Sequence, residues 1–176
     1  MKINIRKELT TDHLAVFNLI KKAFANETFS DHKEQFLVNR LRKSTAFIPE
    51  LSIIAESNSQ VVGHILLTKI NIVNNQQSNP SLALAPISIL PNFQKQGIGS
   101  KLIKYAHKKA IKMGYTSIIL LGHPDYYTKF GYRPTENFGI NLPFDVPKEY
   151  CMAIELINDS LNAIQGTVTY PKEFYE

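Results

Sequence analysis

The feature that most constrains this chain is a buried strand, a glycine turn, an amphipathic helix and a second buried strand between residues 82 and 122. The first strand, LALAPISIL (82–90), is apolar nearly throughout, which is typical of a central strand covered on both faces. The period changes from Gly99 onward and predicts a helix over residues 99–113 that Gly114 ends. TSIILLG (116–122) predicts the second strand. These elements form a βαβ unit with parallel strands and a right-handed crossover.

The other segments predict a mixed α/β architecture in a single domain, residues 1–176, with a mixed central sheet flanked by helices. Thr10 or Thr11 caps a first expected helix, and a second begins near Ser30 or Asp31, where Asp31 and Glu34 resemble a capping box. Residues 74–81 are polar and predict a surface loop. Further strands are expected at residues 2–6, 51–57, 61–73, 138–144, 151–157 and 166–171, with 51–57 and 61–73 forming a hairpin.

Pro86 interrupts the first buried strand of the βαβ unit. Proline has no N–H to donate to a ladder, so the strand should bulge there or splay from its parallel neighbour. A gap between two parallel strands follows from this expectation.

Composition narrows the class of protein. The net charge of +5 and the pI of about 9.2 suit an anionic ligand, a weak nucleic-acid contact or a solvated lysine surface. The single cysteine, Cys151, excludes a disulfide within the chain and a thiolate zinc cluster, and a buried apolar role suits it best. Charged residues interrupt the first 20 positions, and no apolar run reaches the roughly 20 residues of a membrane span. We therefore expect a cytoplasmic protein without a metal or membrane partner.

Two glycines, Gly97 and Gly99, stand where the helix of the βαβ unit begins. A helix N-terminus exposes unpaired N–H groups and favours negative charge, and glycine lets a phosphate approach closely. The sequence lacks the Walker pattern, and Leu102 stands where a dinucleotide fingerprint needs its third glycine. The glycines therefore indicate a phosphate site of another kind.

The remaining pattern, Gln94-Lys95-Gln96-Gly97-Ile98-Gly99, resembles the acetyl-CoA-binding motif of the GNAT superfamily of acyl-CoA N-acyltransferases. VVGHILL (61–67) resembles the third strand of that family, and YYTKFGY (126–132) resembles its Y-x-K-x-G-F/Y motif. The order of elements matches over most of the chain. The combination is similar to a bacterial branch of predicted N-acetyltransferases.

The resemblance implies acetyl-CoA as co-substrate, with the pyrophosphate on the backbone N–H groups of residues 95–100. The pantetheine arm would pair with the backbone near Ile87 and Ile89, where an N–H could polarise the thioester carbonyl. The expected cofactor-binding residues are Ile87, Ser88, Ile89, Gln94, Lys95, Gln96, Gly97, Ile98, Gly99, Ser100 and Tyr127.

Tyr127 matches the motif tyrosine, which implies a proton donor to the leaving thiolate; aromatic packing at the CoA sulfur is the alternative. Glu34 is a candidate base, because it shares a helical face with apolar residues, although capping alone would also explain it. His64, His123 or water are other candidates, and His64 also fits a core position. Gly122-His123 stands where many family members carry an asparagine, which puts the usual asparagine contact in doubt.

The implied function is transfer of an acetyl group from acetyl-CoA to a primary amine by direct attack in a ternary complex. Cys151 lies outside the motifs, so no acyl-enzyme is expected. A catalytically weak acyl-CoA-binding regulatory protein is the alternative, and no DNA-binding motif supports a nucleic-acid partner. The acceptor, a small molecule or a peptide amine, the use of longer acyl-CoAs, and the state as monomer or homodimer stay open.

Overall fold

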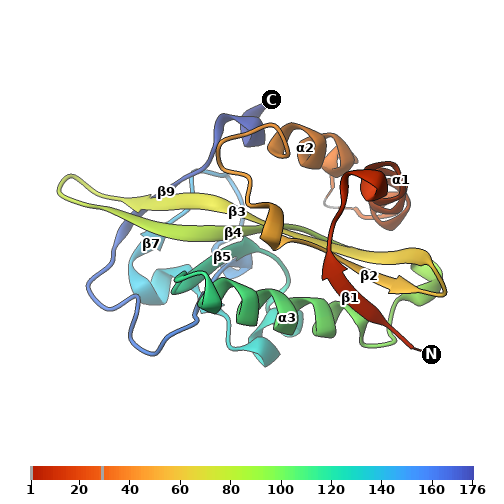
Figure 1. Cartoon of the computed structure of the whole chain (residues 1–176). Coiled ribbons are helices and arrows are strands. Elements are labelled where there is room, and N and C mark those ends of the chain that lie inside the picture. The colour runs from red at the N-terminus through yellow and green to blue at the C-terminus, as the bar shows by residue number, and fades with distance from the viewer. Residues whose placement is uncertain (1, 29) are drawn as a thin grey trace.

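The computed structural model of the protein describes residues 2–28 and 30–176, and it has a nine-stranded mixed sheet at its centre (Figure 1). The main path of the sheet runs β1-β2-β3-β4-β5-β8-β6, and β9 joins β3 to β7. The strands are β1 Asn4–Lys7, β2 Ser52–Ser57, β3 Gln60–Val73, β4 Ser78–Ile89, β5 Ser117–Leu121, β6 Arg133–Pro134, β7 Ile140–Asn141, β8 Cys151–Glu155 and β9 Gly166–Thr169. The expected mixed α/β fold in one unit is confirmed.

Helices cover the sheet on both faces (Figure 1). Helices α1 (His13–Phe24) and α2 (Glu34–Leu41) lie on one face, and α3 (Ile98–Lys112) lies on the other. Alternating residues of the strands supply both cores: Ile65 and Leu67 of β3 pack on the α3 side, and Leu66 packs with α1 and α2. A fourth short helix, α4 (Pro124–Tyr127), follows β5 and ends in a 3₁₀ turn before Gly131.

The two central parallel strands part near Pro86, as the sequence predicts. β4 and β5 pair at Leu82 with Ile118 and at Ala83 with Ile119, and no register beyond these two pairs joins the described strands. β4 also bulges: Ile87 pairs with Ile65 of β3, whereas Leu84 pairs with Leu67, so Ala85 and Pro86 together face Leu66. The backbone of residues 84–89 therefore diverges from β5 and leaves a wedge between the two strands.

Outside α2, three expectations about local structure are wrong. Thr10 and Thr11 do not cap α1, because they lie in a 3₁₀ turn (Thr10–Asp12) and Asp12 is the N-cap of the helix. The loop at residues 74–81 is shorter, because β4 already begins at Ser78; Pro80 is tolerated because β5 joins β4 only from Leu82. The strand at 138–144 is reduced to Ile140–Asn141, between a 3₁₀ turn and Pro143. In the described part of the chain, no helix has both the length and the apolar character needed to cross a bilayer.

Candidate active site

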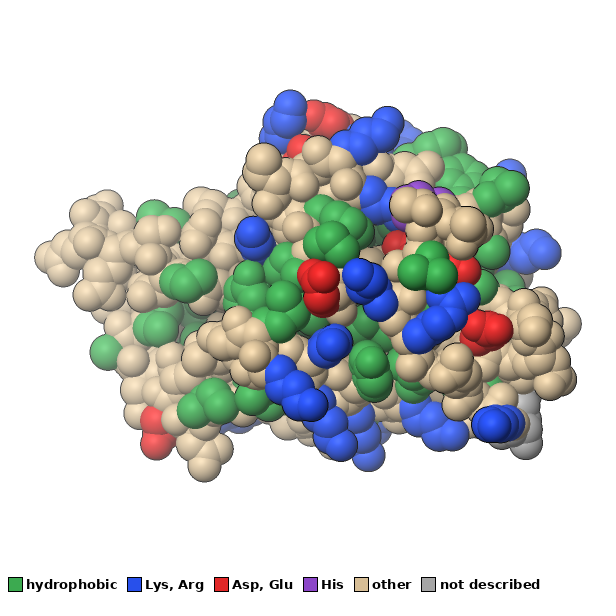
Figure 2. Space-filling view, viewed as in Figure 1, with side chains coloured by type: hydrophobic (Ala, Val, Ile, Leu, Met, Phe, Trp, Pro, Cys, Tyr) green, Lys and Arg blue, Asp and Glu red, His purple; other side chains and the backbone are tan. Residues whose placement is uncertain are grey.

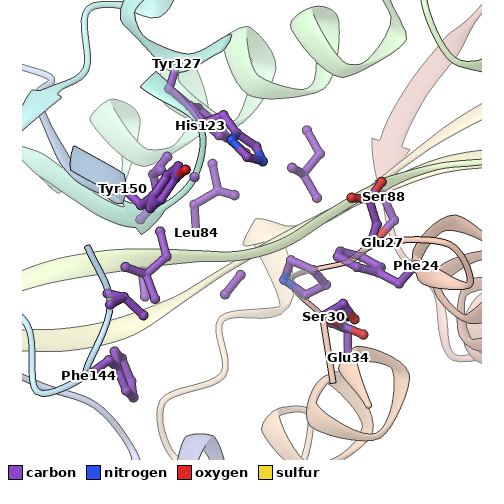
Figure 3. Close-up of a pocket in the computed structure, with 18 of the residues that line it drawn as sticks. Phe24, Glu27, Ser30, Glu34, Leu84, Ser88, His123, Tyr127, Phe144 and Tyr150 are labelled. Atoms are coloured by element: carbon purple, nitrogen blue, oxygen red, sulfur yellow. Dashed lines mark hydrogen bonds between the residues drawn. The ribbon is translucent and has the colours of Figure 1, made fainter. Parts of the chain in front are cut away.

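A cavity of about 770 Å³ occupies the wedge between β4 and β5 (Figure 3). Residues 83–89 of β4 line one wall, and residues 119–123 with Tyr127 line the opposite wall. Phe24, Glu27, Ser30 and Glu34 close the end below α1 and α2, and the segments around Phe144 and Tyr170 close the remaining side. The parting of two strands thus creates a cavity reached by residues from both ends of the chain.

The glycine-rich loop leads from β4 into α3, next to this cavity. Gly97 is the N-cap of α3 and has a left-handed φ of 79°, a conformation that strains any residue with a Cβ. The first N–H groups of the helix, at Ile98, Gly99 and Ser100, have no acceptor within the helix because of its geometry. Gln94 lines the cavity itself and donates to the Ile89 carbonyl at 3.3 Å. The loop is therefore an anion-binding candidate beside the expected pantetheine path.

Tyr126 reaches this loop, which sequence analysis did not anticipate. A Cβ added to Gly99 would lie 2.7 Å from the Tyr126 hydroxyl oxygen. Burial raises the pKa of Tyr126, and a hydrogen bond with Ser100 partly offsets that rise. Lys129 Nζ lies 3.9 Å from the centroid of the Tyr126 ring. Because adjacent residues on a helix point in different directions, the sequence could have suggested that Tyr126 faces α3 and Tyr127 faces the cavity.

Tyr127 lines the cavity and is 8% exposed. Its ring packs edge-on against Tyr126 and Tyr132, with centroid distances of 5.0 and 5.6 Å. Burial, followed by the neighbouring Tyr126, raises the pKa of Tyr127, so the phenol keeps its proton at neutral pH. A Cβ at Gly122 would lie 2.2 Å from Tyr127 Cε2, so glycine at the end of β5 is what admits the ring.

Glu34 lines the cavity and is the first residue of α2, so it does not cap the helix. The helix begins at Glu34 because His32 has a left-handed φ of 58° and Asp31 accepts the Lys33 N–H instead. The Ser30 hydroxyl donates to Glu34 Oε1, and Glu34 Oε2 has no hydrogen-bond partner among the described residues. The predicted capping box is therefore wrong, and the structure brings Glu34 into the same cavity as Tyr127.

The two candidate histidines have different surroundings. His123 lines the cavity, with its ring edge-on to Tyr150 at a centroid distance of 5.3 Å. His64 is completely buried in β3, and burial lowers its pKa to about 4. The core interpretation of His64 thus describes its burial, although its side chain lies on the face of the sheet that α1 and α2 cover.

Among the described residues, neither Cys151 nor a metal-binding cluster adds to the cavity lining. Cys151 begins β8 opposite Leu121, does not line the cavity, and has a pKa raised by burial. Within residues 2–28 and 30–176, no three His, Cys, Asp or Glu side chains form a group that could hold a metal ion.

Side-chain charge is unevenly distributed between the outside of α3 and the cavity. Exposed lysines 101, 104, 108 and 112 follow the outer surface of α3, where Figure 2 shows Lys and Arg gathered on the lower part of this face. In contrast, the cavity lining contains the carboxylates of Glu27, Glu34 and Asp145, and none of its described residues is Lys or Arg.

Comparisons with known proteins point to one family. The model of the Acetyltransferase (GNAT) family matches residues 14–132. The uncharacterized N-acetyltransferase YjhQ of Escherichia coli K12 is 30% identical over 148 residues, covering 80% of this chain and 82% of YjhQ. A GNAT acetyltransferase from Brucella melitensis, crystallised with acetyl-CoA, is 29% identical with a TM-score of 0.81 over 98% of both chains.

The fold extends to a more distant structure. YhbS from Escherichia coli, crystallised with CoA, shares a TM-score of 0.90 with this chain at 21% identity, covering 100% of this chain and 93% of that one. The family match spans more than half of the sequence, including the glycine-rich loop and the YYTKFGY segment. This chain belongs to the GNAT family of acetyltransferases.

Proposed function

We propose that the protein transfers the acetyl group of acetyl-CoA to a primary amine by direct attack in a ternary complex. The observation that carries this proposal is that Tyr127 and Glu34 line one cavity, opened by the parting of β4 and β5. GNAT enzymes use acetyl-CoA as co-substrate, and the similar Brucella protein was crystallised with it.

The cofactor would bind along β4 and the glycine-rich loop. The edge of β4 over residues 84–89 has no β5 partner and can pair with the pantetheine amides as an added strand would. An N–H near Ile87 would polarise the thioester carbonyl. The N–H groups of residues 95–100 would hold the pyrophosphate, with Lys95 and Lys101 adding positive charge. The backbone of Ser88 and Ile89, together with Gln94 and Gln96, would complete the proposed contacts.

The reaction delivers one proton to the leaving thiolate and removes two protons from the ammonium. An ammonium and acetyl-CoA give an amide, the free CoA thiol and one released proton. Tyr127 would donate a proton to the thiolate as the C–S bond breaks, because its raised pKa keeps the phenol protonated. Glu34 would hold the incoming ammonium and begin its deprotonation, since its Oε2 has no described partner. Cys151 takes no part, because it lies outside the cavity lining.

The lining favours a cationic acceptor with an apolar body. The cavity lining includes three carboxylates, and Phe24, Phe144 and Tyr150 supply aromatic surface. An amine with its own carboxylate would meet like charge there, which is unfavourable in a partly enclosed site. We therefore expect arylalkyl amines and diamines to react faster than acidic amino acids.

Release of CoA thiol from acetyl-CoA tests the function, using a panel of arylalkyl amines, diamines, neutral amino acids and acidic amino acids. Calorimetric titration with CoA runs in parallel. The expected result is CoA binding together with turnover of the cationic amines. CoA binding without turnover of any amine would contradict the enzyme and favour a regulatory CoA-binding protein. Preference for acidic amines would contradict the acceptor class.

A further inference from the structure

Ser88 points to the acceptor side of the sheet because β4 bulges at Ala85 and Pro86. Leu84, Ile87 and Ile89 all pack on the α3 side, although Leu84 and Ile87 are an odd number of residues apart. A regular strand would turn residue 88 to the same face as residue 84. The bulge shifts the alternation by one residue, so Ser88 instead faces α1 and α2.

The Ser88 hydroxyl is buried without a partner at the edge of the cavity. Ser88 lines the cavity and is 2% exposed, and its Oγ has no hydrogen-bond partner within the described residues. Figure 3 places it on the same side of the cavity as Phe24, Glu27 and Glu34, opposite His123 and Tyr127. A buried hydroxyl without a partner is unfavourable, so this group is expected to be satisfied by something that enters the cavity.

His64 lies directly across from Ser88 in the β3–β4 pairing, so the two side chains are neighbours on one face. Its Nδ1 is also buried without a partner among the described residues. The other ring nitrogen, Nε2, lies 3.1 Å from Ser52 Oγ. Ser52 in turn donates to Glu8 Oε2 at 2.6 Å, and Glu8 forms a buried ion pair with Arg42.

This chain of contacts determines which nitrogen of His64 carries the proton. Glu8 is ion-paired with Arg42 and is therefore a carboxylate, which can only accept hydrogen bonds. The single Ser52 proton therefore goes to Glu8, and Ser52 Oγ must accept from His64 Nε2–H. Nδ1 is then the unprotonated nitrogen, with a lone pair on the side of the ring opposite to its Ser52 contact.

Burial keeps His64 neutral, although one charged neighbour opposes this effect. Burial lowers its pKa to about 4, Glu8 opposes that effect, and Arg42 and His13 add to it. The ring therefore stays an acceptor at Nδ1 across the whole neutral range of pH.

We infer that the Ser88 hydroxyl binds the acceptor amine by accepting one of its N–H groups. Ser88 Oγ and His64 Nδ1 make no hydrogen bond to each other in the structure, so the hydroxyl would turn its proton to His64 Nδ1 as the amine binds. This inference rests on the proposed function and adds a positioning contact to it. A neutral amine has two N–H groups and one lone pair. Holding one N–H on the acceptor wall leaves the lone pair free to face the thioester beside residues 84–89. His64 acts through Ser88 and is a positioning residue.

The first test measures amine binding without turnover, using benzylamine as the probe and the protein saturated with CoA. Ser88→Ala should weaken benzylamine binding about tenfold, the loss of one well-placed hydrogen bond, and leave CoA affinity unchanged. Ser88→Thr, which keeps a hydroxyl, should restore most of the affinity. The matched control is Ser81→Ala in the same strand. Ser81 does not line the cavity, and its Oγ forms a 2.7 Å hydrogen bond with Ser117 Oγ.

Equal benzylamine affinity in Ser88→Ala and wild type would overturn the inference, whether or not the wild type turns benzylamine over. Wild-type binding without turnover would contradict the proposed function and leave the Ser88 contact standing. Weakening of CoA together with benzylamine would also overturn the inference, because it would mean that the wall as a whole had moved.

The second test reads the tautomer of His64 by ¹⁵N NMR of its ring. Wild type should show a protonated Nε2 and an unprotonated Nδ1, and Ser88→Ala should shift the Nδ1 resonance. Glu8→Gln offers Ser52 a donor, which lets the Ser52 proton turn to Nε2 and moves the ring proton to Nδ1. A protonated Nδ1 in wild type would overturn the inference even if Glu8→Gln, which leaves Arg42 unpaired, does not fold.

Discussion

The two ends of the cavity are built in different ways. The proposed cofactor end comes from one continuous stretch, in which β4, the glycine-rich loop, α3, β5 and α4 follow each other. The proposed acceptor end is assembled from α1, the start of α2, the segment near Phe144 and the segment near Tyr170, which lie far apart in the sequence. A cofactor shared by a family can be bound by one conserved architecture, whereas the acceptor end can change by replacing any one contributing segment.

The largest expected effect falls where the two ends meet. Tyr127→Phe should lower the single-turnover rate of acetyl transfer about 10²-fold, because the proton donor to the thiolate is lost. CoA affinity should barely change, since the ring remains. Rapid-quench kinetics on an accepted amine measures the rate without interference from product release.

Tyr132→Phe is the matched control for Tyr127. Tyr132 contacts the Tyr127 ring, but its hydroxyl bonds His107 Nε2 at 3.0 Å and it does not line the cavity. Equal rates for Tyr127→Phe and wild type would limit Tyr127 to packing and leave the fold untouched.

Stability should depend on pH through two neutral histidines, one fully buried and one half-buried, on opposite sides of the sheet. Burial lowers the pKa of both His64 and His107 to about 4, below the ordinary value of about 6.5. The unfolded chain therefore binds more protons between these values, and the free energy of unfolding falls as pH falls through that range. Urea titrations at pH 7.5 and 5.5 should differ by about 2 kcal/mol.

Each histidine should account for about half of this difference. His107→Gln, which can still bond Tyr132, should reduce the difference to about 1 kcal/mol. An unchanged difference in this variant would show that His107 is already solvated in the folded protein.

An effect confined to the cofactor end is expected from Gly99→Val. The added side chain would meet both the incoming phosphate and the Tyr126 hydroxyl, so CoA affinity should fall by about tenfold or more. Calorimetry measures the affinity, and benzylamine binding to any complex that forms should be unchanged.

The clash with Tyr126 and the clash with phosphate can be separated by comparing Gly99→Ala alone with Gly99→Ala combined with Tyr126→Phe. The double variant lacks the hydroxyl that the new Cβ would contact, while the Cβ still faces the loop. Full recovery of CoA affinity in the double variant would assign the loss to Tyr126 and contradict a direct phosphate contact at Gly99.

The smallest effect is expected at the acceptor end. Glu34→Gln should raise the KM for a cationic amine about fivefold, because the ammonium loses an ionic partner in a partly exposed site. The kcat should fall by a similarly small factor, because water would then take the proton that Glu34 accepts first. The KM for acetyl-CoA should stay constant. Asp31→Asn is the control, since this neighbouring carboxylate is exposed and lies outside the cavity lining. Similar changes in both variants would mean that the amine responds to the overall negative charge of this segment and not to a contact with Glu34.

Local sequence predicted the backbone geometry at Pro86 and Gly97 because its physical causes are local. Pro86 cannot join a ladder, and Gly97 adopts a left-handed conformation, so both positions reveal their geometry without knowledge of neighbours. The need for glycine at position 122 was harder to predict, because it arises from the Tyr127 ring, which packs against that position.

The acceptor end could not be predicted in the same way. Strand alternation places Ser88 with Leu84, and only the observed bulge at Ala85 and Pro86 turns it toward His64. The start of α2 was misplaced because side-chain bonds of Ser30 and Asp31 compete with helix capping. The sequence contains each residue of this end, but their meeting depends on how distant segments pack.

The carboxylate-lined cavity has a consequence for the end of the catalytic cycle. Acetylation converts a cationic amine to a neutral amide, so the proposed product no longer has the charge that Glu27, Glu34 and Asp145 attract. CoA keeps its phosphates and its contacts with the loop. The amide should therefore dissociate before CoA, and product inhibition by the amide should be weak while inhibition by CoA is strong.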